Sequence, residues 1–298
     1  MMDPEASVSG RVPPPGRCTL RHKDADIPPR QVTPVMEIDM PRFARTVGAA
    51  LVVCTVGVFA ARGAVDPETA VGVWLMDEDG GDTAADSSGR GFDGTLNGPD
   101  WAPGKFGSAL QFDGVSWVSV TSEPEMQVGD QLSMMAWFFA EDIGDWRQII
   151  AKSDEYLLRI DPPGEGNKMS AFVKPGGGWE PRASANVPNL DEWIHFAATY
   201  DADPPGDADH LKVYVNGLLA GQSTRPGDIG ATNNDVEIGR WGGGSYFVGI
   251  IDEAAIFNVV LEEADIGAIA ENGLQAALGG LPVNPRGRLT ATWASLKR

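Results

Sequence analysis

Cysteine is nearly absent from this chain of 298 residues: the only two are Cys18 and Cys54. Because both precede residue 65, the longer segment that follows has neither a disulfide framework nor a cysteine-ligated zinc site. Histidine is also rare, and His22, His195 and His210 lack the spacing of a zinc motif or of a Ser-His-Asp triad. These scarcities argue against zinc chemistry and against nucleophilic catalysis.

Helical periodicity and long apolar runs are scarce as well. The chain has 37 glycines and 22 prolines, and from Val71 onward short runs with β-propensity alternate with turn clusters. This pattern predicts an all-β fold, in which Asn216-Gly217 forms a type I′ hairpin turn. Only Glu262–Asn272 has the apolar spacing and the glycine stop of a helix. The predicted strands are Val71–Met76, Ala109–Phe112, Trp117–Val120, Gln131–Phe139, Gln148–Lys152, Tyr156–Ile160, Met169–Val173, Trp193–Tyr200, Leu211–Val215, Leu218–Ser223, Val236–Ile238 and Phe247–Phe257.

Basic residues are few in the middle of the chain. Residues 65–278 contain 36 acidic and 11 basic side chains, a formal charge of −25. A surface this acidic repels nucleic-acid phosphates and anionic lipid, so neither is an expected partner. Cations, neutral glycans and basic proteins remain compatible with it.

The first 64 residues divide into two segments. Residues 1–39 are rich in proline and charge, and we interpret them as a disordered or mis-assigned extension. Residues 40–64 have the pattern of a signal peptide, with Arg42 and Arg45 before the uncharged run Thr46–Ala61. A run of roughly 16 residues is short for a membrane span, which needs about 20. We therefore expect a secreted or cell-surface protein with no membrane span in its mature form, translated from Met40 or Met36.

The C-terminal residues 279–298 carry four basic and no acidic side chains, and they lack a strand pattern. We interpret them as a tail outside the folded domain, either a sorting or docking signal or an inert terminus. The predicted domain itself spans residues 65–278.

A series of short motifs in this domain resembles the laminin G-like jelly rolls of the concanavalin A-like lectin/glucanase superfamily. Each motif is weak alone, but their order along residues 66–275 is specific. The resemblance implies two antiparallel sheets packed face to face with binding loops along the rim. The motifs are Val73–Glu78, Ala85–Leu96, Gly104–Gly114, Leu132–Phe138, Trp193–Tyr200, Val213–Gly217, Ile238-Gly239 and Ile251–Asn258.

Hydrolases that resemble this fold carry E-x-D-x-x-E on one strand, because retaining cleavage uses two carboxyl groups about 5 Å apart. That motif is missing from residues 65–278, where Asp235-Val-Glu237 has no third member. His195 lies in the family's W-x-H pattern, and we expect it to be a packed residue at the sheet edge. No catalytic residue is predicted.

A structural calcium ion is a stronger expectation. In folds of this family such an ion joins the first strand to the last, and Asp252 occupies the position of the final strand's metal-binding aspartate. Asp77, Asp86 or carbonyl groups near Gly91 are the candidate partners, since hard cations bind carboxylate and carbonyl oxygens. The alternative is that Asp252 only makes a hydrogen bond across the sheet.

A glycan site combines aromatic platforms with polar side chains on loops. Trp179 and Trp241 adjoin glycine runs, which favours exposed loop tips, and Trp146 and Tyr246 are the other candidates. The strand tryptophans Trp74, Trp137 and Trp193 are predicted to be core residues.

These features favour a non-catalytic recognition or adhesion module that binds a polysaccharide or an extracellular protein, with calcium as a stiffening ion. Two alternatives remain: a structural component of the cell envelope, and an unrecognised polysaccharide hydrolase or lyase. Fold resemblance alone does not choose among them.

Overall fold

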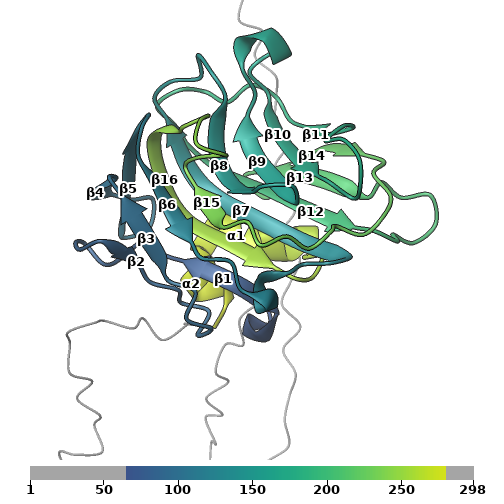
Figure 1. The fold of residues 1–298 in the computed structure, drawn as a ribbon, viewed down its shortest axis with the longest axis horizontal. Helices are drawn as coiled ribbons and strands as arrows, with labels where there is room; N and C mark the ends of the chain where they lie inside the picture. Colours follow the sequence, from purple (N-terminus) through teal and green to yellow (C-terminus); the bar gives the residue numbers. More distant parts are fainter. Residues whose placement is uncertain (1–64, 280–298) are drawn as a thin grey trace, which may run out of the picture. The chain divides into compact units, whose positions relative to one another are not determined.

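A computed structural model describes residues 65–279, which form two antiparallel eight-stranded sheets (Figure 1). The first sheet has the strand order β14-β13-β12-β7-β16-β5-β4, with β1 paired to β16 beside this path. The second has the order β11-β10-β9-β8-β15-β6-β3-β2. The strands are β1 (Ala70–Trp74), β2 (Thr83–Ala84), β3 (Gly94–Asn97), β4 (Asp100–Pro103), β5 (Ser108–Asp113), β6 (Trp117–Val120), β7 (Gln131–Ala140), β8 (Arg147–Lys152), β9 (Tyr156–Ile160), β10 (Met169–Val173), β11 (Ala183–Ser184), β12 (Trp193–Asp201), β13 (Leu211–Val215), β14 (Leu218–Ser223), β15 (Val236–Ile238) and β16 (Val248–Phe257), and the helices are α1 (Glu263–Asn272) and α2 (Leu274–Ala277).

The main hydrophobic core lies between the two sheets. Alternate residues of each strand point to opposite faces, so one set from each sheet meets in the middle. Phe138 and Phe196 enter this core from the first sheet, and Leu158 and Ile238 enter from the second; all four are fully buried. The predicted all-β sandwich of two sheets is therefore confirmed, and its architecture is consistent with a jelly roll.

The helices cover part of the outer face of the first sheet. Figure 1 shows both helices beside the strands of this sheet. Ile266 and Ile269 of α1 and Leu274 of α2 pack in one cluster with Met135 and Phe257, whose neighbours in the strands point into the main core. Burial of these apolar side chains fixes α1, because each contributes roughly 1.5–3 kcal/mol relative to an exposed position. This outer face is thus partly closed by the chain itself.

Most elements match the sequence-based prediction. All twelve predicted strands are present, with bounds within two residues of those expected, and the predicted helix is α1. Asn216 and Gly217 have φ angles of 51° and 84°, as a type I′ turn requires. The prediction missed β2, β3, β4, β11 and α2, all four residues long or shorter.

Two placements of individual side chains were predicted wrongly. His195 does not lie at a sheet edge, because β12 is paired on both sides, with β13 and β7. Trp193 is not a core residue: it is only partly buried and contacts Phe139, its neighbour across β7, at a ring-centroid distance of 5.7 Å. Trp74, in contrast, is fully buried in the core as predicted.

The predicted extension 1–39, signal peptide 40–64 and all but the first residue of the tail lie outside the described residues. Within residues 65–279, no helix is both long and apolar enough to cross a membrane.

Candidate ligand-binding face

The outer face of the second sheet carries a separate apolar cluster. Ala151, Leu157 and Phe172 are directly opposite one another on β8, β9 and β10, and they point away from the main core. Two loop side chains, Trp179 and Trp241, pack against them. We call the surface formed by these five residues the aromatic face.

The two tryptophans contact each other. Their ring centroids are 6.0 Å apart with an interplanar angle of 85°, and Trp179 meets Phe172 edge to face at 6.4 Å. Both indoles are partly exposed, so each combines a packed edge with an accessible surface. Edge-to-face geometry is favourable because the positive ring edge meets the negative ring face.

The loop of Trp241 is a tight turn. Trp241 and Gly244 exchange two backbone hydrogen bonds, and the residues between them, Gly242 and Gly243, have φ angles of 61° and 81°. Glycine adopts such angles without steric cost, so the run of glycines lets the chain reverse directly after the indole. A carboxylate oxygen of Glu237 on β15 accepts a hydrogen bond from the Gly242 amide at 2.9 Å and ties the turn to the sheet.

The loop of Trp179 is held by an arginine from a distant part of the chain. The Arg225 guanidinium donates hydrogen bonds to the carbonyl oxygens of Val173, Gly178 and Glu180, on both sides of Trp179. Because the guanidinium presents five donors in a fixed plane, it can hold several carbonyls at once. The glycine run predicted an exposed loop tip; Trp179 does lie in a loop, but it is only partly exposed because the fold positions that loop.

A second aromatic pair lies on the same sheet. Trp117 of β6 contacts Tyr246 at a centroid distance of 6.2 Å, and the Arg240 guanidinium lies 3.7 Å from the Trp117 ring centroid. Arg240 also pairs with Glu237, the residue that anchors the Trp241 turn. The predicted site residue Tyr246 is thus linked to the Trp241 turn through Trp117, Arg240 and Glu237.

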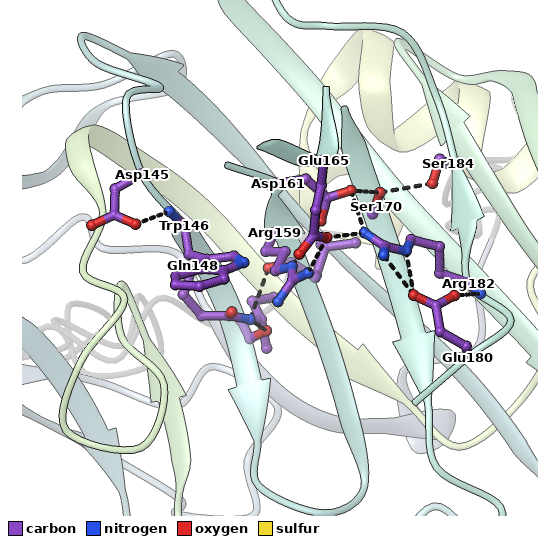
Figure 2. Close-up of polar contacts among 12 residues, drawn as sticks. Asp145, Trp146, Gln148, Arg159, Asp161, Glu165, Ser170, Glu180, Arg182 and Ser184 are labelled. Carbon is purple, nitrogen blue, oxygen red and sulfur yellow. Dashed lines mark hydrogen bonds and ion pairs between the residues drawn. The ribbon is translucent and has the colours of Figure 1, made fainter. Parts of the chain in front are cut away.

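A polar network adjoins the aromatic face (Figure 2). Asp161, which is almost fully buried, accepts hydrogen bonds from Arg159 and Arg182 at 2.8 Å each and from the Ser170 hydroxyl at 2.6 Å. The same two guanidinium groups lie over the Phe172 ring, 4.4 and 4.8 Å from its centroid. Both cations are therefore neutralised by carboxylates while their flat surfaces rest on an aromatic ring.

Glu165 and Glu180 complete this network by pairing with Arg182. Burial favours a higher pKa for Glu165, but hydrogen bonding and charge from Arg182, together with the charge of Arg159, hold the pKa below its usual value. Each carboxylate of the network is thus engaged by at least one arginine, which leaves none of them as a free base.

Trp146 reaches the network from the loop before β8. It is 41% exposed, and its indole lies close enough to Glu165 to contribute to the lowered pKa of that carboxyl group. On the adjoining strand, Gln148 is buried beside Arg159 and donates to the carbonyl oxygens of Ile150 and Leu158, while its own Oε1 has no partner (Figure 2).

The structure therefore places all four predicted aromatic residues around one sheet face, although they come from separate loops. Sequence analysis missed Phe172, Arg159, Arg182, Trp117 and Arg240. One signal was available for Arg159: an arginine alternating with Tyr156, Leu158 and Ile160 marks the outward-facing side of β9.

The acidic residues considered for catalysis are engaged elsewhere. Asp235 accepts a hydrogen bond from the Ser122 amide, and Glu237 pairs with Arg240 and the Gly242 amide. Their roles in the structure are to join loops to strands.

The aspartates considered for calcium do not all meet. Asp77 and Asp252 hold the same turn, because Asp252 accepts from the Phe106 amide at 2.9 Å and Asp77 accepts from the Ser108 amide at 3.0 Å. Asp86 belongs to a different loop: its two oxygens accept from Ser88 and from the amides of Val73 and Phe92. Asp77 and Asp252 are thus brought together, and Asp86 is not.

Asp252 is fully buried, and its Oδ1 has no hydrogen-bond partner. Burial raises its pKa to about 7, with a further contribution from the charge of Asp77, whose own pKa is also raised by burial. A carboxylate oxygen that has no hydrogen-bond partner and lies beside a second carboxylate is the type of ligand that a hard cation binds. Within residues 65–279, no group of three or more His, Cys, Asp and Glu side chains is arranged to hold a metal, so peptide carbonyls or water would have to complete such a site.

A two-sheet antiparallel sandwich is an architecture that lectin domains share with proteins of many other functions. A family model described as "Concanavalin A-like lectin/glucanases superfamily", of laminin G type, matches residues 112–267. The chain belongs to this family, and the resemblance read from its motifs is confirmed.

Solved structures share the fold at low sequence identity. Domain 4 of the extracellular arabinanase AbnA from Geobacillus stearothermophilus, in complex with arabinotriose, is 21% identical with a TM-score of 0.55, over 68% of this chain and 98% of that one. The binding domain of Paraclostridial Mosquitocidal Protein 1 is 12% identical with a TM-score of 0.55, over 68% and 52%. The Botulinum neurotoxin serotype G binding domain is 15% identical with a TM-score of 0.53, over 68% and 50%.

This chain thus spans nearly all of the arabinanase domain but only about half of each toxin binding domain. No match was found among curated proteins.

Proposed function

We propose that the protein is a non-catalytic glycan-binding module, secreted or displayed at the cell surface, and that the aromatic face holds its ligand. The observation that carries this proposal is the contact between Trp179 and Trp241, two partly exposed indoles from separate loops, packed on Phe172. Sugar rings present flat arrays of C–H groups, which pack on indole surfaces, while their hydroxyl groups need polar partners nearby.

The polar partners lie in the adjoining network. Arg182, Glu180 and Glu165 are partly exposed and can donate to or accept from hydroxyl groups at the edge of a stacked sugar. Because each arginine there is already paired with carboxylates and the domain carries a formal charge of −25, a neutral polysaccharide is favoured over an anionic one. The arabinotriose complex of the similar arabinanase domain supports a neutral glycan ligand.

Calcium is part of this proposal as a structural ion. Asp77 and Asp252 would hold it, with the unpartnered Oδ1 of Asp252 as the first ligand atom. A bound cation would neutralise the buried carboxylate of Asp252 and the partly buried carboxylate of Asp77. It would also stiffen the turn between Gly104 and Ser108, which both aspartates hold through its backbone amides.

The test is a binding screen of the full chain against neutral and anionic polysaccharides, with calcium and with a chelator, and with reducing-end release measured in parallel. The expected result is binding to one or more neutral polysaccharides without product release. Product release would establish an enzyme instead. If the protein bound none of the glycans, an extracellular protein partner or a structural role in the envelope would be favoured.

A further inference from the structure

A pocket of about 230 Å³ opens at one end of the sandwich, between the first residues of β10 and β12, the end of β13 and the loop 185–192. None of the aromatic-face residues lines it. It is therefore a second site, separate from the one on which the proposed function rests.

The floor of the pocket is apolar. Met169 and Ile194 are 3% and 6% exposed and belong to the main core, and Val215 packs against that core. One wall is formed by Val187 and Pro188, and Val187 is 48% exposed despite its apolar side chain. An exposed valine next to an accessible apolar floor forms an apolar surface. The removal of a small apolar ligand group from water is favourable at such a surface.

The rim of the pocket is rich in amides. The Asn186 side chain has no hydrogen-bond partner within residues 65–279, and it lies beside Asn189, Glu192 and Asn216. Asn216 uses its carbonyl oxygen to accept from the His195 amide, which leaves its NH₂ group available. Asn189 donates to Glu192 at 2.8 Å, which leaves its carbonyl oxygen available. The rim therefore offers both donors and acceptors to a ligand.

Trp193 forms the remaining wall and is partly exposed. Its contact with Phe139 fixes the indole, so the ring is a preformed surface. The volume is below the roughly 300–1,000 Å³ of pockets that hold drug-sized molecules, which suits one sugar ring or one substituent but not a chain lying lengthwise.

We infer that this pocket binds the acetamido group of a neutral N-acetylated amino sugar. The acetyl methyl group matches the apolar floor of Met169, Ile194 and Val215, and the amide N–H and C=O match the acceptors and donors of the asparagine rim. A sugar ring carrying this group would lie against Trp193. Glu192 and the acidic surface disfavour an anionic sugar.

The test uses the full chain and tri-N-acetylchitotriose as the probe, with cellotriose and the deacetylated glucosamine trimer as comparisons, in calorimetric titrations. The acetylated trimer is expected to bind more tightly than either comparison. Asn186→Ala should weaken its binding about tenfold, the loss expected when one hydrogen bond to the ligand is removed. Asn97→Ala, a change at an asparagine outside the pocket, is the matched control.

Trp179→Ala separates the two sites: it should leave binding of the acetylated trimer within twofold while weakening the binding of a neutral polysaccharide at the aromatic face about tenfold or more. Equal binding of cellotriose, no binding of the acetylated trimer, or full binding by Asn186→Ala would overturn the pocket assignment. A loss of acetylated-trimer binding in Trp179→Ala would place that ligand on the aromatic face instead.

Discussion

The indoles of Trp179 and Trp241 meet edge to face at 6.0 Å although the glycine-rich loops that carry them are far apart in the chain. Each loop is fixed by its own device, Arg225 for the first and Glu237 for the second. Because both loops are held independently, the two indoles already have a fixed arrangement before a ligand binds. Little side-chain conformational entropy therefore remains to be lost on binding.

Removing either indole is expected to abolish most of the binding to a neutral polysaccharide. Trp179→Ala and Trp241→Ala should each weaken affinity about tenfold or more, because aromatic anchors at the centre of a binding surface typically dominate its energy. Affinity electrophoresis of the full chain measures this loss.

Trp101→Ala is the matched control for these variants. Trp101 is a partly buried tryptophan on β4 at the edge of the other sheet, where its indole donates to the Gly81 carbonyl. Equal losses in all three variants would indicate a general effect of indole removal and would count against the aromatic face.

Calcium is expected to stabilise the chelator-treated protein through Asp77 and Asp252. A ligand that binds only the folded state at about 100 times its dissociation constant adds about 2.7 kcal/mol to the free energy of unfolding. Thermal melts with and without calcium should therefore separate, and Asp252→Asn should remove the separation.

Asp86→Asn distinguishes a metal ligand from an aspartate that only organises a loop. Asp86 caps the loop after β1 and lies outside the turn that Asp77 and Asp252 hold, so this variant should melt at a lower temperature yet keep the calcium-dependent shift. If Asp86→Asn lost the shift and Asp252→Asn kept it, the assignment of the site would be wrong.

Much of the fold follows from local pattern. The strands of the two sheet centres have strong β-propensity, with apolar residues alternating or continuous, as in Tyr156–Ile160, and all of them were predicted. The missed strands, such as β2 and β11 with two residues each, have no periodicity to detect and exist because longer strands pair with them. The pattern also could not place His195 in the interior of a sheet, since strand order depends on long-range pairing.

The candidate site was predictable only in part. Glycine runs next to Trp179 and Trp241 marked both as loop residues, but their contact depends on which loops lie above β8, β9 and β10. The same limitation applies to the candidate partners of Asp252: the family resemblance offered Asp77 and Asp86 as alternatives, and only the tertiary structure shows that Asp77 holds the same turn as Asp252 and Asp86 holds another loop. Composition and motif spacing describe which residues are available, and only the sheet order decides which of them meet.

The buried His195 is expected to make the protein less stable as the pH falls. Burial lowers its pKa from 6.5 to about 3. Between pH 6.5 and pH 3, His195 is therefore protonated in the unfolded chain but stays neutral in the folded one. Stability is then lost as pH falls below about 6.5, by about 2 kcal/mol between pH 7 and pH 5.

The measurement is the difference in urea-unfolding free energy between the parent and His195→Gln at each pH. The parent should lose stability relative to the variant as the pH falls. The raised pKa values of Asp252 and Glu253, about 7 and about 8, act in the opposite direction in both proteins and cancel in this difference. Parallel curves for the two proteins would contradict the prediction.

The buried pair Lys152–Glu155 at the turn between β8 and β9 is expected to stabilise the fold only as a pair. Both side chains are at most 1% exposed, and Glu155 also accepts from the amide and hydroxyl of Thr232, which ties a distant loop to this turn. Lys152→Met leaves a buried carboxylate without its cation and should cost about 3–5 kcal/mol in urea unfolding, whereas adding Glu155→Gln should recover part of that loss. Lys174→Met provides the control, because Lys174, which directly follows β10, is only partly buried and pairs with the exposed Asp154 of the same turn, so its removal should cost less than about 1 kcal/mol. If the two lysine variants were destabilised equally, burial would not be the cause of the effect.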